Sequence, residues 1–474
     1  MSKYILKIKL IMPFGDDHLN TLHTLINYIQ DLTFQDLPDP VVQGAKRSFL
    51  DTLSAMMAGS GAESPMRLLG LIREWGGREE GTILIHGDKV PLPHAAWVNA
   101  AMVRGFDFDE VIEKPVAHAS ATTIPVALGV CEFRKLMRHR PVSGQELITA
   151  VIMGNDLSCR LRRADKGPGT GWLSEPFNTL GAAALGARLF GFNQEALSCC
   201  LGIAYFQCCG NLGATMGEGG GMMAIIGQGV SANAAITSVL LADRGVTAQK
   251  DFLDGMYGLY KMYGNGSYDQ DVLTGGLGKD FPYSHATIKA YPGCGATQAA
   301  IDGTLTLTRE HAIKSDDVEQ VILRVGKLGY HICRKTGNPN NTADALWSYP
   351  YSTAVALAKG DVRIKDFTEQ AIHDPQVTAL IPKVIVEMDS AQKLAGSADI
   401  EIKTKDGKQY RKLLEHAKGH PTNPVTWEDL TDKFRQCNAF SARPVSKERE
   451  KAIIDMIHGL EKVDDVTHII EVMK

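Results

Sequence analysis

The sequence predicts a mainly α protein with a large all-helical domain and a smaller α+β domain. Three observations support this fold class. The chain has 474 residues, which exceeds the size at which one hydrophobic core usually divides into domains. Apolar residues recur every three to four positions through residues 17–280, and strand-like alternation appears mainly after residue 282. We therefore expect a discontinuous helical domain from residues 17–284 and 416–474, and an α+β domain from residues 285–415.

Helix signals follow one another through the first part of the chain. DLPDPVVQGAKRSFLDTLSAMMAGS (36–60) has apolar residues at helical spacing and ends near a glycine, a common helix terminator. PHAAWVNAAMVRGFDFDE (93–110) is rich in small residues, which permit close packing. In SGQELITAVIMGNDLSCRLRRA (143–164), Ser143 is placed to cap the helix, with Glu146 three residues later. Further helices are expected over residues 178–192, 193–212 and 227–247.

Strand signals mark the second domain. VEQVILRVGKLGYHIC (318–333) alternates in its first half, and KVIVEMD (383–389) reads as another strand. ADIEIKTKDGKQYRKLLEHA (398–417) predicts a hairpin that turns at its Asp-Gly pair. Between these strands, ALWSYPYSTAVALAKG (345–360) predicts a helix. Helices resume at Thr426, which has an aspartate three residues later in the form of a capping box.

Composition narrows the class of protein. The formal net charge is −4 and the pI is about 6.4, so there is no electrostatic reason to expect nucleic acid or a membrane as a partner. Residues 1–16 have no signal-peptide pattern and are expected to form a poorly ordered leader, which favours a cytoplasmic protein. The nine cysteines have no disulfide or metal-ligand spacing, so we expect neither a disulfide framework nor a metal site.

One stretch concentrates ionisable residues beside an apolar run. In RGFDFDEVIEKPVAHASATTIPVAL (104–128), Asp107 and Asp109 lie two positions apart, His118 follows a short loop, and no charge occurs after it. This pattern is compatible with a helix–loop–helix or with the floor of an active site.

The chain resembles the MmgE/PrpD family, which includes 2-methylcitrate dehydratase, cis-aconitate decarboxylase and iminodisuccinate epimerase. The resemblance covers roughly residues 20–470 and depends on six motifs that occur in the family's order. These are LDTLSAMMAGS, NAAMVRGFDFDE with HASATTIPVAL, NTLGAAALGARLFG, GQGVSANAAITSVLLADRGVTAQKDFLDG, IKAYPGCGATQAAIDG and GHPTNPVTWEDLTDKFRQC.

This resemblance implies a large helical domain, an α+β lid domain, a site in the cleft between them and a homodimer. It also implies chemistry on a small carboxylate or acyl substrate without a metal or organic cofactor.

Family reactions need a base, an acid and groups that stabilise negative charge on carboxylate or enolate oxygens. His118 aligns with the family histidine and suits proton exchange near neutral pH. Asp107 aligns with the family's first aspartate. Asp109 would lie about 200° from Asp107 on a helix, so the two would not share a face, and Asp109 is expected to help bind substrate. Glu110 is expected to be solvated.

Two further candidates come from the predicted lid domain. Lys289 precedes Tyr-Pro at the domain boundary and is placed by the resemblance to hold a carboxylate or protonate a carbanion. Tyr351 matches a family tyrosine whose phenol can donate to an oxyanion. Its neighbour Tyr349 leaves the register open by two positions, so it is a candidate for substrate binding.

The sequence departs from decarboxylase-type members at three expected site positions. Trp172 and Ile112 stand where histidines are expected, and Met222 stands in place of a lysine. Because a tricarboxylate normally needs several fixed cations, these apolar replacements favour a less charged substrate.

Four functions remain open. The favoured one is a cofactor-independent lyase of dehydratase or hydratase type that acts beside a carboxylate or carbonyl group. The alternatives are an isomerase or epimerase that removes and returns a proton, a decarboxylase, and an inactive family member that acts as a binding protein.

Overall fold

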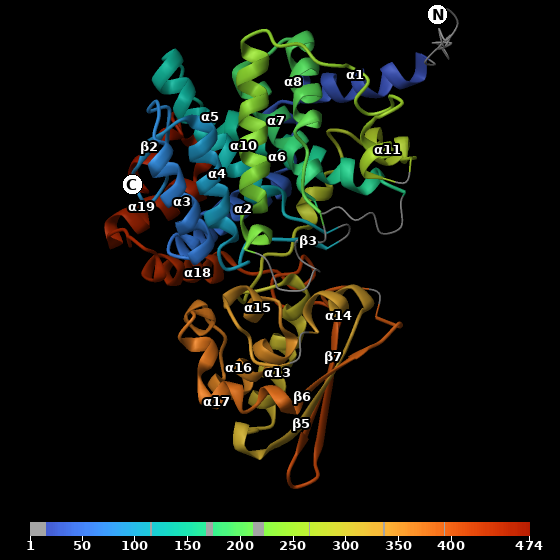
Figure 1. Cartoon of the computed structure of the whole chain (residues 1–474), viewed down its shortest axis with the longest axis vertical. Helices are drawn as coiled ribbons and strands as arrows, with labels where there is room; N and C mark the ends of the chain where they lie inside the picture. The colour runs from blue at the N-terminus through green and yellow to red at the C-terminus, as the bar shows by residue number, and fades with distance from the viewer. Residues whose placement is uncertain are drawn as a thin grey trace, which may run out of the picture.

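The structure, a computed structural model, describes residues 16–113, 116–166, 174–211, 222–264, 266–334, 337–392 and 394–474. Figure 1 shows a large helical body above a smaller body that contains both strands and helices. The strands of the smaller body form a four-stranded sheet. The prediction of a mainly α protein with a large helical domain and a smaller α+β domain is confirmed.

The larger body is built from helices that span most of residues 16–274 and from three helices at the C-terminal end. They are α1 (Asp16–Asp31), α2 (Asp39–Gly59), α3 (Glu63–Trp75), α4 (Leu92–Arg104), α5 (Ala119–Arg138), α6 (Gly144–Ala164), α7 (Glu175–Phe190), α8 (Gln194–Phe206), α10 (Met223–Asp243), α11 (Leu259–Tyr263), α12 (Gln270–Thr274), α18 (Trp427–Phe440), α19 (Lys447–His458) and α20 (Thr467–Val472). Two short antiparallel pairs interrupt them, β1 (Gly81–Thr82) with β2 (Lys89–Val90) and β3 (Ile112–Glu113) with β4 (Val116–Ala117).

Small residues allow the central helices to lie close together. A Cβ atom on Gly59 of α2 would lie 1.9 Å from the carbonyl oxygen of Met102 in α4, so only glycine fits this crossing. Helix α10 is long and apolar enough to cross a membrane by length and composition, but it packs against α4, α7 and α8. The small-residue segments therefore form the centre of the helical domain.

The smaller body contains one mixed sheet in the order β6-β5-β7-β8. Its strands are β5 (Val318–Val325), β6 (Val384–Met388), β7 (Ala398–Thr404) and β8 (Gln409–Leu414). Strands β5 and β6 are parallel and the other pairs are antiparallel. The helices are α13 (Gln298–Glu310), α14 (Lys327–Cys333), α15 (Thr342–Leu346), α16 (Tyr349–Lys359) and α17 (Pro375–Thr378), and α13 and α16 pack against the sheet and each other.

Eight short 3-10 helices occur in the described chain. They are η1 (Phe34–Asp36), η2 (Pro282–His285), η3 (Gly295–Thr297), η4 (Ser315–Asp317), η5 (Ile364–Phe367), η6 (Ala371–His373), η7 (Ile381–Lys383) and η8 (Leu460–Lys462).

Local signals in the sequence fix several boundaries. Ser143 caps α6 by accepting a hydrogen bond from the Glu146 amide at 3.2 Å, and Thr426 caps α18 in the same way. The hairpin between β7 and β8 turns at Asp406-Gly407, where Gly407 has a φ of +84°. These predicted caps and this predicted turn are confirmed.

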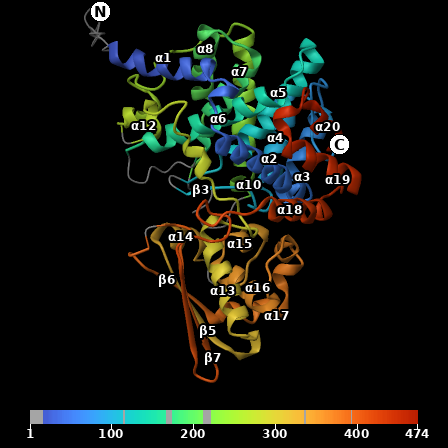
Figure 2. The same cartoon turned by 180° about the vertical axis from the view of Figure 1, so that it is seen from behind.

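The C-terminal helices return to the helical body. Figure 2 shows α18, α19 and α20 beside α2 and α3, and α18 packs directly on α2. The chain therefore crosses between the two bodies twice, near residues 288 and 419, where Ile288 N donates to Gly419 O at 3.0 Å.

One predicted helix ends earlier than expected. The segment 93–110 forms α4 only as far as Arg104, and Asp107 has a φ of +47°. Aspartate tolerates this left-handed conformation better than most residues, so helical periodicity alone does not reveal the break.

Candidate active site

The loop after α4 gathers the charged residues of the sequence motif. Asp107 and Asp109 lie in this loop, and His118 occupies the N-cap of α5 after the β3–β4 hairpin. The expectation that the two aspartates would point apart is wrong, because the helix has already ended. Arg104 Nη1 donates to Asp107 Oδ1 and to Asp109 Oδ1, each at 2.5 Å.

Asp107 and Asp109 are buried as ionised carboxylates. Burial by itself would raise the pKa of both groups, but the positive charges beside them, Arg104 first, outweigh it. Both pKa values therefore lie below the ordinary range. Arg104 was missed in the sequence, although its position three and five residues before the aspartates was a usable signal.

The imidazole of His118 is oriented by Asp109. His118 Nδ1 lies 2.9 Å from Asp109 Oδ2 and 3.1 Å from the Glu110 carbonyl oxygen, both acceptors. Arg104 Nη1 is 3.0 Å from the same nitrogen, but its two hydrogens already reach carboxylate oxygens. We therefore assign the proton to Nδ1, which leaves Nε2 as a base with no hydrogen-bond partner among the described residues.

Burial, followed by the charge of Arg104, lowers the pKa of His118. The side chain of His118 is 13% exposed, so it lies at the edge of the buried cluster. A neutral imidazole with a free Nε2 and a carboxylate on Nδ1 is the arrangement that general base catalysis requires.

Lys289 enters this cluster from the first crossing segment, near residue 288. It is fully buried, and its Nζ donates to both Oδ1 and the carbonyl oxygen of Asp107, each at 2.6 Å. Trp347 Nε1 donates to the other carboxylate oxygen of Asp107 at 2.7 Å. Asp107 therefore binds groups from both bodies of the protein, a connection that the sequence did not reveal because Trp347 is 240 residues away.

Lys433 on α18 binds the backbone of the two segments that carry the cluster. Its Nζ donates to Asp51 Oδ1 at 2.6 Å and to the carbonyl oxygens of Phe108 and Lys289 at 2.8 and 2.9 Å. The ammonium group also lies 3.6 Å from the centre of the Phe108 ring. A single buried lysine thus ties the aspartate loop to the segment that carries Lys289.

Glu110 is buried and not solvated as expected. Its carboxyl accepts hydrogen bonds from Ser120 Oγ at 2.5 Å and from Ser48 Oγ. Burial raises the pKa of Glu110 to about 7, although the two hydroxyls favour its ionised form. These hydrogen bonds indicate a structural role beneath the loop.

Three predicted site residues lie apart from the cluster or in the core. Tyr351 donates its hydroxyl proton to Asp366 O and packs on Phe367, so it belongs to the core of the smaller body. Tyr349 is fully buried, and its hydroxyl has no partner among the described residues. Ile112, in β3, packs in a small buried cluster with Ala117, Cys159 and Tyr283. These positions do not support contact with substrate at the charged cluster, because each ring or side chain faces a core. Trp172 lies outside the described residues.

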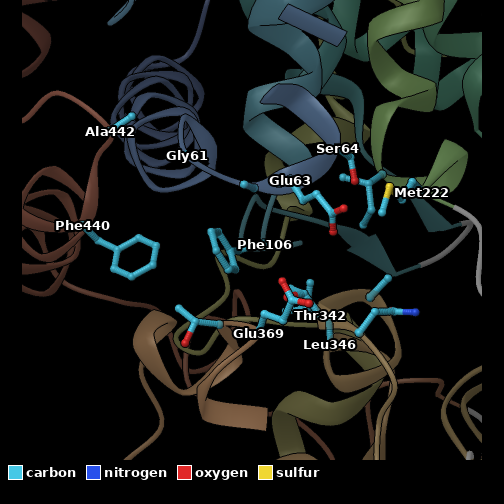
Figure 3. A pocket seen from close by; sticks show the side chains of 16 residues that line it. Gly61, Glu63, Ser64, Phe106, Met222, Thr342, Leu346, Glu369, Phe440 and Ala442 are labelled. Atoms are coloured by element: carbon cyan, nitrogen blue, oxygen red, sulfur yellow. The ribbon is translucent and has the colours of Figure 1, made fainter. Parts of the chain in front are cut away.

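A pocket of about 310 Å³ is lined by residues of both bodies (Figure 3). Phe106, Met222 and Leu346 contribute apolar surface, and Glu63 and Glu369 contribute carboxylates. No Lys, Arg or His is among its described lining residues. Two of its lining residues, Phe106 and Leu346, are each followed in the chain by a residue of the cluster, Asp107 and Trp347, but no cluster residue is among its described lining residues. Of the substrate-binding candidates that the structure describes outside the cluster, Met222 is the one that lines this pocket.

Among the residues that the structure describes, two groups of side chains have donor atoms close enough to hold a metal ion. In the first, Asp107, Asp109 and His118 offer atoms within 4.8 Å of one another, but Arg104 and Lys289 already neutralise these carboxylates. A divalent cation would have to displace both cations.

The second group is Glu113, His416 and His420. The two imidazole rings are stacked with centroids 3.6 Å apart and an interplanar angle of 10°. Nitrogen lone pairs lie in the ring plane, so parallel stacked rings cannot both direct a lone pair at one ion. Neither group is arranged as a metal centre.

Comparison with known proteins gives two kinds of match. The family model described as the MmgE/PrpD N-terminal domain matches residues 23–271, and the model of the MmgE/PrpD C-terminal domain matches residues 291–459. Cis-aconitate decarboxylase of Homo sapiens is 25% identical over 462 residues, covering 94% of this chain and 93% of the relative. The Mus musculus protein of the same name is 24% identical over 461 residues, covering 94% and 92%. That of Aspergillus terreus strain NIH 2624 is 23% identical over 472 residues, covering 95% of each.

Proposed function

The chain belongs to the MmgE/PrpD family, and from this premise we propose that it is a cofactor-independent lyase of a small organic acid. The reaction is of dehydratase or hydratase type and takes place beside a carboxylate or carbonyl group. The observation that carries the proposal is the orientation of His118, whose Nδ1 is held by Asp109 at 2.9 Å while Nε2 has no described partner.

In the proposed reaction, His118 Nε2 removes a proton from the carbon next to the carboxylate or carbonyl group. The electron pair of the broken C–H bond first moves onto the carboxylate or carbonyl group as an enolate. It then forms the C=C bond as the C–O bond on the neighbouring carbon breaks. The departing hydroxyl accepts a proton and leaves as water. Asp109 stabilises the imidazolium that forms, because its carboxylate lies on Nδ1. Hydration is the same path in reverse.

The charges near the site favour a substrate with few carboxylates. Arg104 and Lys289 are each bound to a buried aspartate, so neither is free to neutralise a substrate carboxylate. The pocket between the two bodies has apolar and acidic residues and no described cation. A second pocket, which Lys289 lines, also contains Arg363, Lys418 and Lys433, but each of these cations is paired with an aspartate. Burying several unpaired carboxylates here would be unfavourable. We therefore propose an acid that carries one carboxylate, or an acyl group, and an apolar portion.

Decarboxylation is the second candidate, because the three relatives named above are all called cis-aconitate decarboxylase. In that reaction the C–C bond to the carboxylate breaks, carbon dioxide leaves, and a protonated group delivers a proton to the resulting carbanion. The replacement of an expected lysine by Met222 argues against it, because that position supplies no proton.

The proposal is tested by mass spectrometry of the purified protein in deuterated water with hydroxy, unsaturated and keto acids of one to three carboxylates. We expect loss or gain of water on a substrate with few carboxylates. The His118→Ala variant should abolish this activity, and His468→Ala, which removes an exposed histidine on α20, should not.

Release of carbon dioxide would instead support the second candidate. Turnover of a tricarboxylate such as cis-aconitate would refute the proposed substrate class. Equal activity of wild type and His118→Ala would refute the assignment of the base.

A further inference from the structure

A second buried acid lies in the helical body near His118. Glu175 is the first residue of α7 and is 5% exposed. Its Oε1 accepts a hydrogen bond from Gln228 Nε2 at 3.2 Å, while Oε2 is buried and has no hydrogen-bond partner among the described residues. A carboxyl group held in this way has one oxygen fixed and one oxygen left over for another molecule.

The hydrogen bonds of Glu175 lead to His118. Gln228 Oε1 accepts from Thr122 Oγ1 at 2.7 Å and from Asn178 Nδ2 at 3.0 Å. Asn178 Nδ2 also lies 3.2 Å from the carbonyl oxygen of His118. Glu175 is therefore linked through two amide side chains to the residue that we assign as the base.

Other buried polar atoms in the same region also have no described partner. They are Arg104 Nε and Asn178 Oδ1, and the charges of Arg104 and Glu175 act on each other. Native proteins rarely leave buried polar atoms unpaired, and several in one region indicate a place for a polar ligand or water.

The packing around Glu175 also fixes its position. A Cβ atom on Gly210 would lie 2.7 Å from Glu175 Cβ, and one on Gly227 would lie 3.3 Å from Glu175 Oε1. Glycine at these two positions leaves the space that the glutamate occupies.

Glu175 is suited to carry a proton near neutral pH. Burial raises its pKa to about 7, and the charge of Arg104 only partly offsets this effect. Both the protonated and the ionised forms are thus present under ordinary conditions, as a general acid requires.

We propose that Glu175 is the general acid of the reaction and that its Oε2 delivers a proton to an uncharged oxygen of the substrate. This inference rests on the proposed lyase function and adds to it. As the C–O bond breaks, the departing hydroxyl takes the proton of Glu175 and leaves as water, while His118 keeps the proton removed from carbon. Transfer of one proton from His118 to Glu175 through solvent restores both groups.

This assignment also names the group that the enzyme recognises at this position. A protonated carboxyl donates a hydrogen bond to a hydroxyl or carbonyl oxygen, whereas its ionised form repels a carboxylate. The substrate should therefore present a hydroxyl or an acyl oxygen to Glu175, and not a second carboxylate.

The first test compares wild type with Glu175→Gln, which keeps the shape and the hydrogen bond to Gln228 but cannot transfer a proton. We expect water loss to fall by about 10²–10⁴-fold with little change in KM. Exchange of the substrate C–H with deuterated water, which needs only His118, should persist. The matched control is Glu195→Gln. Glu195 is exposed and forms an ion pair with Lys250, so this variant should behave as wild type.

The pH dependence separates a proton donor from a structural residue. Since the acid must be protonated, the wild-type rate should fall as the pH rises through about 7, and this decline should disappear in Glu175→Gln. Retained water loss with an unchanged pH profile in Glu175→Gln would overturn the inference while leaving the proposed function intact.

A second measurement does not depend on turnover. Infrared difference spectra of the whole protein, taken over pH 5–9, should contain C=O bands of protonated carboxyls that titrate near pH 7, from Glu110 and Glu175, and the contribution of Glu175 should be missing in Glu175→Gln. Should no substrate in the panel react, the proposed function fails and this contribution still decides whether Glu175 carries a proton. A spectrum that is identical in wild type and Glu175→Gln overturns the assignment.

Discussion

Removal of the buried Lys433 ammonium should destabilise the junction between the two bodies. In Lys433→Met, Asp51 loses its ion-pair partner, and the carbonyl oxygens of Phe108 and Lys289 each lose a hydrogen bond. Methionine has a similar length and keeps most of the apolar contact, so the variant mainly removes the charge and its three hydrogen bonds. The effect should therefore report the strength of this junction.

The expected size follows from the burial of both partners. The Lys433 and Asp51 side chains are 7% and 0% exposed, and breaking a buried ion pair by removing one partner costs about 3–5 kcal/mol. Burial raises the pKa of Asp51 even with Lys433 present, so the carboxyl can take up a proton when the lysine is gone. We therefore expect a loss at the lower end of this range, about 3 kcal/mol of the free energy of unfolding at pH 7.

The loss should depend on pH with a definite sign. Without Lys433, the pKa of Asp51 in the folded state rises further above its unfolded value, which is about 3.9. A carboxyl with a raised folded pKa favours folding at low pH and loses that contribution as the pH rises. The deficit of Lys433→Met relative to wild type should therefore be larger at pH 7 than at pH 5.

Urea unfolding followed by circular dichroism measures both quantities. With a slope of about 3 kcal/mol per M, the midpoint should fall by about 1 M at pH 7. Lys412→Met breaks an exposed pair with Glu310 and should change stability by less than about 1 kcal/mol. The double variant with Asp51→Asn should recover part of the loss. A midpoint equal to that of Lys412→Met, or a deficit independent of pH, would refute this account of the junction.

Two further predictions concern the predicted site residues. Asp109→Asn removes a negative charge that raises the pKa of His118, so the acid limb of the pH–rate profile should move to lower pH. The value of kcat should fall by about 10²–10⁴-fold. An acid limb at the wild-type pH would contradict the pairing of Asp109 with His118. Tyr351→Phe should lose about 0.5–1.5 kcal/mol of stability in thermal denaturation with its hydrogen bond to Asp366 O, whereas Tyr349→Phe should lose none. A tenfold loss of kcat in Tyr351→Phe would show that this phenol acts in catalysis after all.

The sequence motif located much of the cluster but not its geometry. The sequence indicates four residues of the cluster, Asp107, Asp109, His118 and Lys289, and the structure brings all four together. The predicted orientation of Asp107 relative to Asp109 is wrong, because the sequence predicts a helix through residue 110 and α4 ends at Arg104. The break at Arg104 depends on a positive φ at Asp107, which aspartate permits but does not dictate.

Residues from distant parts of the chain were harder to find. Lys433 lies 382 residues from Asp51, and no local pattern in either segment predicts that pair. Glu175 reads in the sequence as an ordinary acidic residue in the first turn of a helix, which is a common place for one. Its burial, and the lack of a described partner for its Oε2, become visible only in the tertiary structure, where α7 packs against α10.

The balance of buried charge connects these findings to the choice of substrate. Arg104, Lys289 and Lys433 face Asp51, Asp107 and Asp109, so the described cations and carboxylates of the cluster cancel. Glu110 and Glu175 have no such cation partner among the described residues, and burial raises the pKa of each to about 7, so each is protonated for part of the time near neutral pH. A substrate that brought several carboxylates would add negative charge although each described cation of the cluster is already paired with an aspartate, and it would also make Glu175 harder to ionise. A substrate with one carboxylate and a hydroxyl or acyl oxygen avoids both penalties, because the neutral acid can donate to that oxygen while His118 takes the proton from carbon.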